Sequence, residues 1–144
     1  MRSLDLASKS WILGHVPAYG TPIPVLDSML YIVHVYNTGG AWSIFSGHVA
    51  WLVALGVAAL SILFAMRKHL ELHKLSHQWV FGLIVGGILG NLWDRIVYGH
   101  VIDFIDVHLP FYRWPSFNVA DIGISVGVAL YCWMIFFGHK KVAK

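Results

Sequence analysis

The sequence predicts a small polytopic membrane protein, in which a bundle of membrane-spanning helices carries a small sheet at one face. Two observations predict this fold class. The 144-residue chain is 58% hydrophobic and only 12% charged, with a mean hydropathy of +0.67, and a soluble chain of that composition would expose large apolar patches. It also contains three stretches without a formally charged residue, 49–66, 77–93 and 122–138, each close to the roughly 20 residues that cross a bilayer.

The chain is predicted to begin with a partial membrane segment at residues 3–16. This segment is short and contains Asp5 and Lys9. Either it is a helix that enters the membrane partway, or the chain lacks its natural start. The second and third uncharged stretches can be extended if their polar end residues face protein or water. We therefore predict one integral-membrane domain over residues 1–144, with spans at about 3–16 (partial), 49–66, 77–96 and 118–138 and outer segments at about 17–48 and 97–117.

Basic residues predict the orientation of the bundle. Three Lys or Arg residues lie between positions 67 and 74, and three lysines lie between 140 and 144. Two crossings separate these clusters, so both emerge on one side, which the positive-inside rule makes cytoplasmic. The net charge of +3 comes from such short flanks and not from a basic stripe, so we expect no nucleic-acid partner. The outer side receives most of the acidic residues: Asp94, Asp103, Asp106 and Asp121.

A short strand or hairpin is predicted on the outer surface. Residues 29–36 are mostly β-branched or aromatic, and the turn-forming residues 37–40 follow them, a pattern typical of a strand. Residues 102–108 could form a second strand of the same sheet or a helix at the membrane interface.

Asp103 and Asp121 are the predicted catalytic pair. Asp103 lies in an apolar frame, and Asp121 lies at the outer end of the last span. A carboxylate at that depth costs roughly 2.5 to 3.5 kcal/mol, so it seldom lacks a partner or a purpose. Two neighbouring carboxyl groups that share a proton suit peptide hydrolysis, with one as base and the other as acid. The alternative is that Asp121 is a helix N-cap and Asp103 a solvated loop residue.

A second polar cluster follows the glycines of the middle span. Gly86 and Gly90 have the spacing that lets another helix approach closely. Asn91, Asp94 and Arg95 could orient a catalytic carboxylate or hold a substrate carbonyl, or could be an interfacial anchor whose charges reach water.

The chain offers little for metal or thiol chemistry. The single cysteine, Cys132, lies in an apolar run, which leaves neither a disulfide framework nor a cysteine-based metal site. His100, Asp103, Asp106 and His108 are close in sequence but match no tight zinc pattern. We therefore expect no metal ion and no cofactor.

Four motifs, taken in order, resemble those of lipoprotein signal peptidase, also called signal peptidase II. The similarity extends from residue 4 to about residue 127. Each motif is modest alone, whereas four in this order and on the same side of the spans are specific. The motifs are NTGGAWSIF at 37–45, GGILGNLWDR at 86–95, VIDF at 101–104 and WPSFNVAD at 114–121.

This resemblance implies a four-transmembrane-helix bundle with a small periplasmic β-cradle, in which the first helix is shortened here because only four residues precede Asp5. It implies an aspartic endopeptidase of the bacterial inner membrane that cleaves diacylglyceryl-modified prolipoproteins before the lipidated cysteine. The expected partners are these substrates and membrane lipid, with no obligate protein partner. The dyad of the family falls on Asp103 and Asp121.

The resemblance also implies supporting residues. Asp94 is expected to orient other groups, and the motif LDLASK at 4–9 resembles the family's first-helix motif, with Asp5 and Lys9 in supporting roles. Trp42 and Trp93 stand where the family has a smaller side chain, so we expect both to narrow a lipid-facing groove. The residues expected to surround the dyad and contact substrate are Asn37, Asn91, Arg95 and Asn118.

Two other functions fit parts of the sequence. A proton-relay or transport protein could use the same two aspartates, but it predicts acids through the depth of the membrane, whereas the core spans are uncharged. A structural subunit predicts that amide substitutions at Asp103 and Asp121 would be nearly silent.

Overall fold

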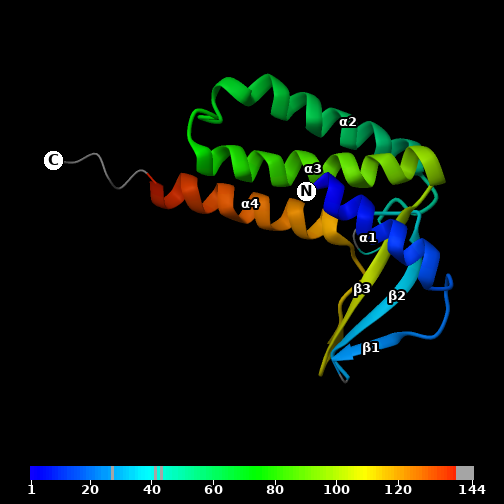
Figure 1. The fold of residues 1–144 in the computed structure, drawn as a ribbon. Helices are drawn as coiled ribbons and strands as arrows, with labels where there is room; N and C mark the ends of the chain where they lie inside the picture. The colour runs from blue at the N-terminus through cyan, green and yellow to red at the C-terminus, as the bar shows by residue number, and fades with distance from the viewer. Residues whose placement is uncertain (27, 41, 43, 139–144) are drawn as a thin grey trace.

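The computed structural model describes residues 1–26, 28–40, 42 and 44–138. Helices α2, α3 and α4 run side by side with α3 in the middle, and the sheet lies at one end of them (Figure 1). In chain order the elements are α1 (Arg2–His15), β1 (Ile23–Leu26), β2 (Leu30–Asn37), α2 (Val49–Ala65), the 3₁₀ turn η2 (Met66–Lys68), α3 (Leu75–Tyr98), β3 (Val101–Leu109), β4 (Tyr112–Arg113) and α4 (Val119–Gly138).

Three helices of the described chain are long and apolar enough to cross a membrane. They are Val49–Lys68, Leu75–Tyr98 and Val119–Phe137, and they coincide with the predicted stretches 49–66, 77–96 and 118–138. Helix α1 has 14 residues, a length of about 21 Å at 1.5 Å per residue, which is less than the thickness of the hydrocarbon core.

The sheet is antiparallel, with strand order β1-β2-β3-β4. The prediction of a strand at 29–36 is confirmed by β2, and residues 102–108 are a strand, not an interfacial helix. Most residues of β3 are buried, so its backbone N–H and C=O groups need partners within the protein, and pairing with β2 supplies them. The register places Val35 opposite Asp103 and Asn37 opposite Val101, so the end of β2 lies beside the beginning of β3.

An apolar cluster joins the sheet to the bundle. Ile12 and Val16, at the end of α1, are buried together with Ile102 and Phe104 of β3. Burial of such side chains stabilises the fold by roughly 1.5 to 3 kcal/mol each. The beginning of β3 is therefore held firmly against α1, and Asp103 lies between its two buried apolar neighbours.

Glycines of α3 allow the other helices to approach it closely. A Cβ atom on Gly86 would lie 2.7 Å from the Cβ of Met1, and a Cβ on Gly87 would lie 2.5 Å from the backbone oxygen of Ala120. A Cβ atom on Gly90 would meet both Asp5 of α1 and Ala120 of α4. Gly86 and Gly90 thus allow the N-terminal segment to approach α3, as predicted, and Gly87 and Gly90 do the same for α4.

The basic connection and the sheet lie at opposite ends of the bundle. The connection between α2 and α3, with Arg67, Lys68 and Lys74, is at the end away from the sheet (Figure 1). The tail lysines used in the prediction of orientation, Lys140, Lys141 and Lys144, lie outside the described residues.

Candidate active site

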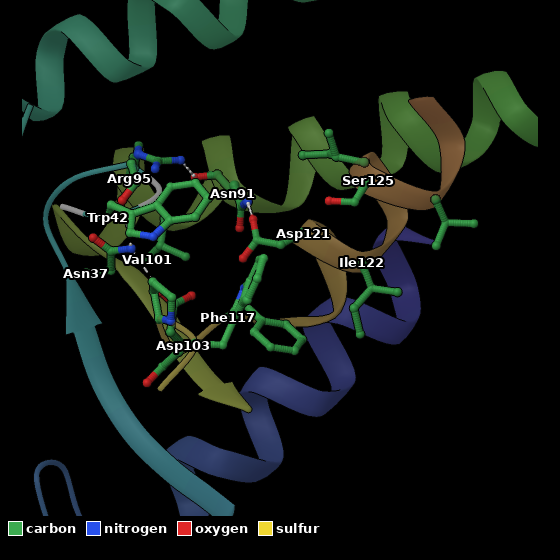
Figure 2. A pocket seen from close by; sticks show the side chains of 16 residues that line it. Asn37, Trp42, Asn91, Arg95, Val101, Asp103, Phe117, Asp121, Ile122 and Ser125 are labelled. Atoms are coloured by element: carbon green, nitrogen blue, oxygen red, sulfur yellow. Dashed lines mark hydrogen bonds between the residues drawn. The ribbon is translucent and has the colours of Figure 1, made fainter. Parts of the chain in front are cut away.

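A cavity of about 450 Å³ opens where the sheet meets α3 and α4. Asp103 reaches it from β3 and Asp121 from the first turn of α4 (Figure 2). Three other predicted site residues line it: Asn37 from the end of β2, and Asn91 and Arg95 from α3. The structure therefore brings together side chains that lie up to 84 residues apart in the sequence.

Asp103 is buried and receives two side-chain hydrogen bonds. Only 2% of the Asp103 residue is exposed to solvent. Asn37 Nδ2 donates to one carboxylate oxygen at 2.9 Å, and Asn118 Nδ2 donates to the other at 2.8 Å. Burial, followed by the negative charge of Asp121, raises the pKa of Asp103 from 3.8 to about 7, and the two donors only partly oppose this shift.

Asp121 and Asn118 cap α4 reciprocally. The backbone N–H of Asp121 donates to the side-chain oxygen of Asn118 at 3.1 Å, and the backbone N–H of Asn118 donates to an Asp121 carboxylate oxygen at 3.2 Å. This is a capping-box arrangement. Asn91 Nδ2 donates to the other Asp121 oxygen at 2.7 Å. The N-cap is therefore Asn118 and not Asp121, as the alternative had it; Asp121 is the third residue of α4, completes the capping box and also faces the cavity.

Behind the cavity, Lys9 forms the centre of a buried ion cluster. Its ammonium lies 2.8 Å from the carboxylates of both Asp5 and Asp94, and all three residues are at most 2% exposed. The carboxylate of Asp5 accepts the backbone N–H of Ala120 at 2.9 Å, and that of Asp94 accepts the backbone N–H of Ile102 at 3.2 Å. Two buried charges of one sign are therefore compensated by one cation and by backbone donors.

Arg95 links α3 to the turn after β2. Its Nη2 donates to the backbone oxygen of Gly39 at 3.0 Å, and its Nη1 donates to the backbone oxygen of Asn91 at 3.2 Å. The buried Nε has no hydrogen-bond partner among the described residues. Arg95 therefore fixes the position of the turn that carries Gly39, while its Nε is left without a partner among the described residues.

Asp106, three residues after Asp103, belongs to a separate cluster. Arg113 donates to its carboxylate at 2.6 and 3.2 Å, and His108 lies 3.0 Å from it. Burial alone would raise the pKa of Asp106, but these partners outweigh burial and hold the pKa below its usual value. In the described part of the chain, no three His, Cys, Asp or Glu side chains converge as a metal site would require.

The comparison with known proteins agrees with this arrangement. The family model described as signal peptidase (SPase) II matches residues 1–137. The chain belongs to the signal peptidase II family. Three similar proteins are lipoprotein signal peptidases: those of Xanthomonas euvesicatoria pv. vesicatoria (36% identity over 89% of this chain and 78% of that protein), Synechocystis sp. (38%, 93% and 81%) and Janthinobacterium sp. (39%, 75% and 67%).

Solved structures show the same fold. One, described as a bacterial membrane enzyme, has a TM-score of 0.86 and 28% identity over 99% of this chain and 87% of that chain. A second, with the same description, has a TM-score of 0.80 and 29% identity over 99% and 88%. Because the chain belongs to the signal peptidase II family and has the fold of these membrane enzymes, it is a membrane peptidase.

The remaining predicted residues of this signal peptidase II chain divide into two groups. Asn118 is fully buried beneath the cavity and bonds both aspartates, and Trp42 lines the cavity as expected. Trp93 does not line this cavity; the guanidinium of Arg2 lies over the Trp93 ring, 5.5 Å from its centre, and the expected place of Trp93 at a lipid-facing groove stays a prediction.

Of the aromatic residues at the rim of the cavity, sequence reasoning named only Trp42. Trp42 Nε1 donates to the hydroxyl of Tyr112 at 2.8 Å, and the rings of both residues contact Trp114. Phe117 also lines the cavity, and its backbone bonds Ile105 of β3. The motif at 114–121 contained two of these aromatic residues, but the contribution of Tyr112 depends on the β3–β4 turn.

Proposed function

We propose that this chain is a membrane aspartic endopeptidase that removes the signal peptide from diacylglyceryl-modified prolipoproteins, on the N-terminal side of the lipidated cysteine. Family membership supports the removal of signal peptides from prolipoproteins. The observation that carries the aspartic mechanism is that Asp103 and Asp121 line one cavity, each held by its own amide donor. We assign the proton of the resting pair to Asp103, because its pKa is about 7.

The proposed reaction needs only these two carboxyl groups and water. The Asp121 carboxylate takes a proton from a water molecule as that water attacks the scissile carbonyl carbon. Protonated Asp103 donates a hydrogen bond to the carbonyl oxygen, which becomes negatively charged as the tetrahedral intermediate forms. The C–N bond then breaks, and a carboxyl proton passes to the leaving amine of the lipidated cysteine.

The lining of the cavity suggests how the substrate lies. Ile122 and Val126 of α4, a helix that could span the membrane, are exposed and also line the cavity. We place the diacylglyceryl chains there, where they gain apolar contacts without leaving lipid. Asn37, Asn91 and Arg95 would contact the peptide at the dyad, with Asn118, Asp94, Asp5 and Lys9 in supporting roles behind it.

We further propose that residues 1–144 form one peptidase domain of the bacterial inner membrane, with the dyad at the periplasmic face. The basic connection between α2 and α3 lies at the end away from the sheet, which supports a cytoplasmic location for that end. Helix α1 packs against α3 and α4 beside the sheet and would be the fourth helix of the bundle.

Cleavage of a diacylglyceryl-modified prolipoprotein by the purified protein in lipid vesicles tests this function. Asp103→Asn and Asp121→Asn should each lower the rate by about 1,000-fold or more, with and without a chelator. Asp106→Asn is the matched control, because it makes the same change on the same strand in a cluster that does not line the cavity; its activity should stay within a few-fold of native.

Each alternative predicts a different result. Full activity of both dyad variants would show that the catalytic pair is wrongly assigned. Loss of activity in the native protein on addition of a chelator would favour a metallopeptidase, and absence of cleavage by folded native protein would refute the function. The proton-relay alternative predicts proton flux across the vesicle wall without cleavage, and family membership gives it no support.

A further inference from the structure

Each aspartate of the proposed dyad faces an asparagine whose amide is oriented from its other end. A side-chain amide has an acceptor oxygen at one end and an NH₂ group with two donors at the other. A donor that binds the oxygen therefore fixes the direction in which the NH₂ group points. For Asn37 that donor is the backbone N–H of Gly39, at 2.9 Å from the side-chain oxygen. The Asn37 NH₂ group consequently faces Asp103.

The Asn91 side-chain oxygen has two donors, one of which is an ammonium group from another helix. Lys9 Nζ lies 3.2 Å from the Asn91 side-chain oxygen, and Asn118 Nδ2 donates to the same oxygen at 3.1 Å. An ammonium has three donors and no acceptor, so it can face only the oxygen end of the amide. The Asn91 NH₂ group is thereby turned toward Asp121, to which it donates at 2.7 Å.

Lys9 itself does not line the cavity and bonds neither Asp103 nor Asp121. Its charge acts on Asp103 only through space, where it slightly opposes the rise of the Asp103 pKa. Its position is set by Asp5 and Asp94, whose carboxylates also bind the first turn of α4 and the first residues of β3. These are the two elements that carry the dyad. The ion cluster is therefore placed to hold Lys9 at a constant distance from the Asn91 oxygen.

We propose that Lys9 is a positioning residue for cleavage, acting through Asn91 by keeping the amide NH₂ group directed at Asp121. This inference rests on the proposed function. Without the ammonium, the Asn91 oxygen keeps only the Asn118 donor, so the amide is held less firmly and its NH₂ group can rotate away from the carboxylate of Asp121. The Asp121 carboxylate would then lose the hydrogen bond that orients it toward the attacking water and the scissile carbonyl. The cavity that binds substrate would keep its shape.

A double-mutant cycle on prolipoprotein cleavage in vesicles tests this role. Lys9→Met in the native background should lower kcat roughly 10- to 100-fold. KM should change much less than kcat, because Lys9 lies outside the cavity and reaches the substrate only through Asn91. In an Asn91→Ala background the same change should lower kcat by no more than about twofold. In an Asn37→Ala background, the matched control, it should lower kcat by its full factor, because the Asn37 amide is oriented without Lys9.

An equal loss of kcat in the Asn91→Ala and Asn37→Ala backgrounds would overturn the proposal, and so would a change in KM alone. Lys9→Met leaves two buried carboxylates without their cation, so the cycle is repeated in an Asp5→Asn/Asp94→Asn background if that variant does not fold. There, loss of the coupling to Asn91 would again overturn it. Failure of the proposed function would be distinct, because the native protein itself would not cleave.

Discussion

Replacement of Asp103 by asparagine is expected to stabilise the folded protein at neutral pH even though it removes the proposed acid. The folded protein holds the Asp103 pKa at about 7, against 3.8 for the free side chain. Between these two values the folded state keeps a proton that the unfolded chain has lost, so its stability falls as the pH rises. An asparagine does not titrate, so the stability of the variant does not fall in this way as the pH rises.

The magnitude follows from the size of the shift. One pKa unit corresponds to about 1.4 kcal/mol, so the buried carboxyl lowers the free energy of unfolding by about 1.5 kcal/mol at pH 5 and by up to about 4 kcal/mol above pH 7. The asparagine NH₂ group would face the NH₂ group of Asn37 or Asn118, at a pH-independent cost of about 1 kcal/mol. The signature is therefore the pH dependence: the advantage of Asp103→Asn should grow by about 3 kcal/mol from pH 5 to pH 8.

Reversible unfolding in mixed detergent micelles, followed by tryptophan fluorescence at several pH values, measures this difference. Glu71→Gln is the control, because the hydrogen bond from Lys74 lowers the pKa of this exposed carboxylate and keeps it ionised throughout the range. Its difference from native should not vary between pH 5 and 8. The same flat profile for Asp103→Asn would refute the reasoning, since it would mean that Asp103 is already ionised at pH 5 in the folded protein.

Three other results are expected. If Asp103 must be protonated for cleavage, kcat should fall about tenfold per pH unit above pH 7; a constant kcat to pH 9 would assign the proton elsewhere. Gly87→Ala should lower the free energy of unfolding by about 1 to 3 kcal/mol, because its Cβ would meet the backbone of α4, whereas Gly82→Ala, with nothing within 4 Å, should be neutral or stabilising. Trp42→Phe and Tyr112→Phe remove the same hydrogen bond, so each should raise KM about 2- to 10-fold, and the double variant should raise it no further.

The sequence by itself determined the helices and the strand that frame the site. Three long uncharged stretches became α2, α3 and α4, because a continuous apolar run of that length is a local property that needs no partner to be recognised. The β-branched and aromatic run at 29–36 became β2 in the same way. The order of four motifs was sufficient to indicate the family and to name the polar residues that gather around the cavity.

The tertiary structure alone decided which way the polar side chains face. Asp103 and Asp106 lie an odd number of positions apart on one strand, so their side chains point to opposite faces. Only the pairing of β3 with its neighbours decides that Asp103 faces the cavity and Asp106 faces Arg113. The sequence left residues 102–108 open between strand and helix, since that choice depends on a partner strand about 70 residues away. The Asn91 side-chain oxygen accepts hydrogen bonds from Lys9, 82 residues earlier, and from Asn118, 27 residues later. Interactions of that kind exist only after the chain has folded, because they join groups that no local pattern connects.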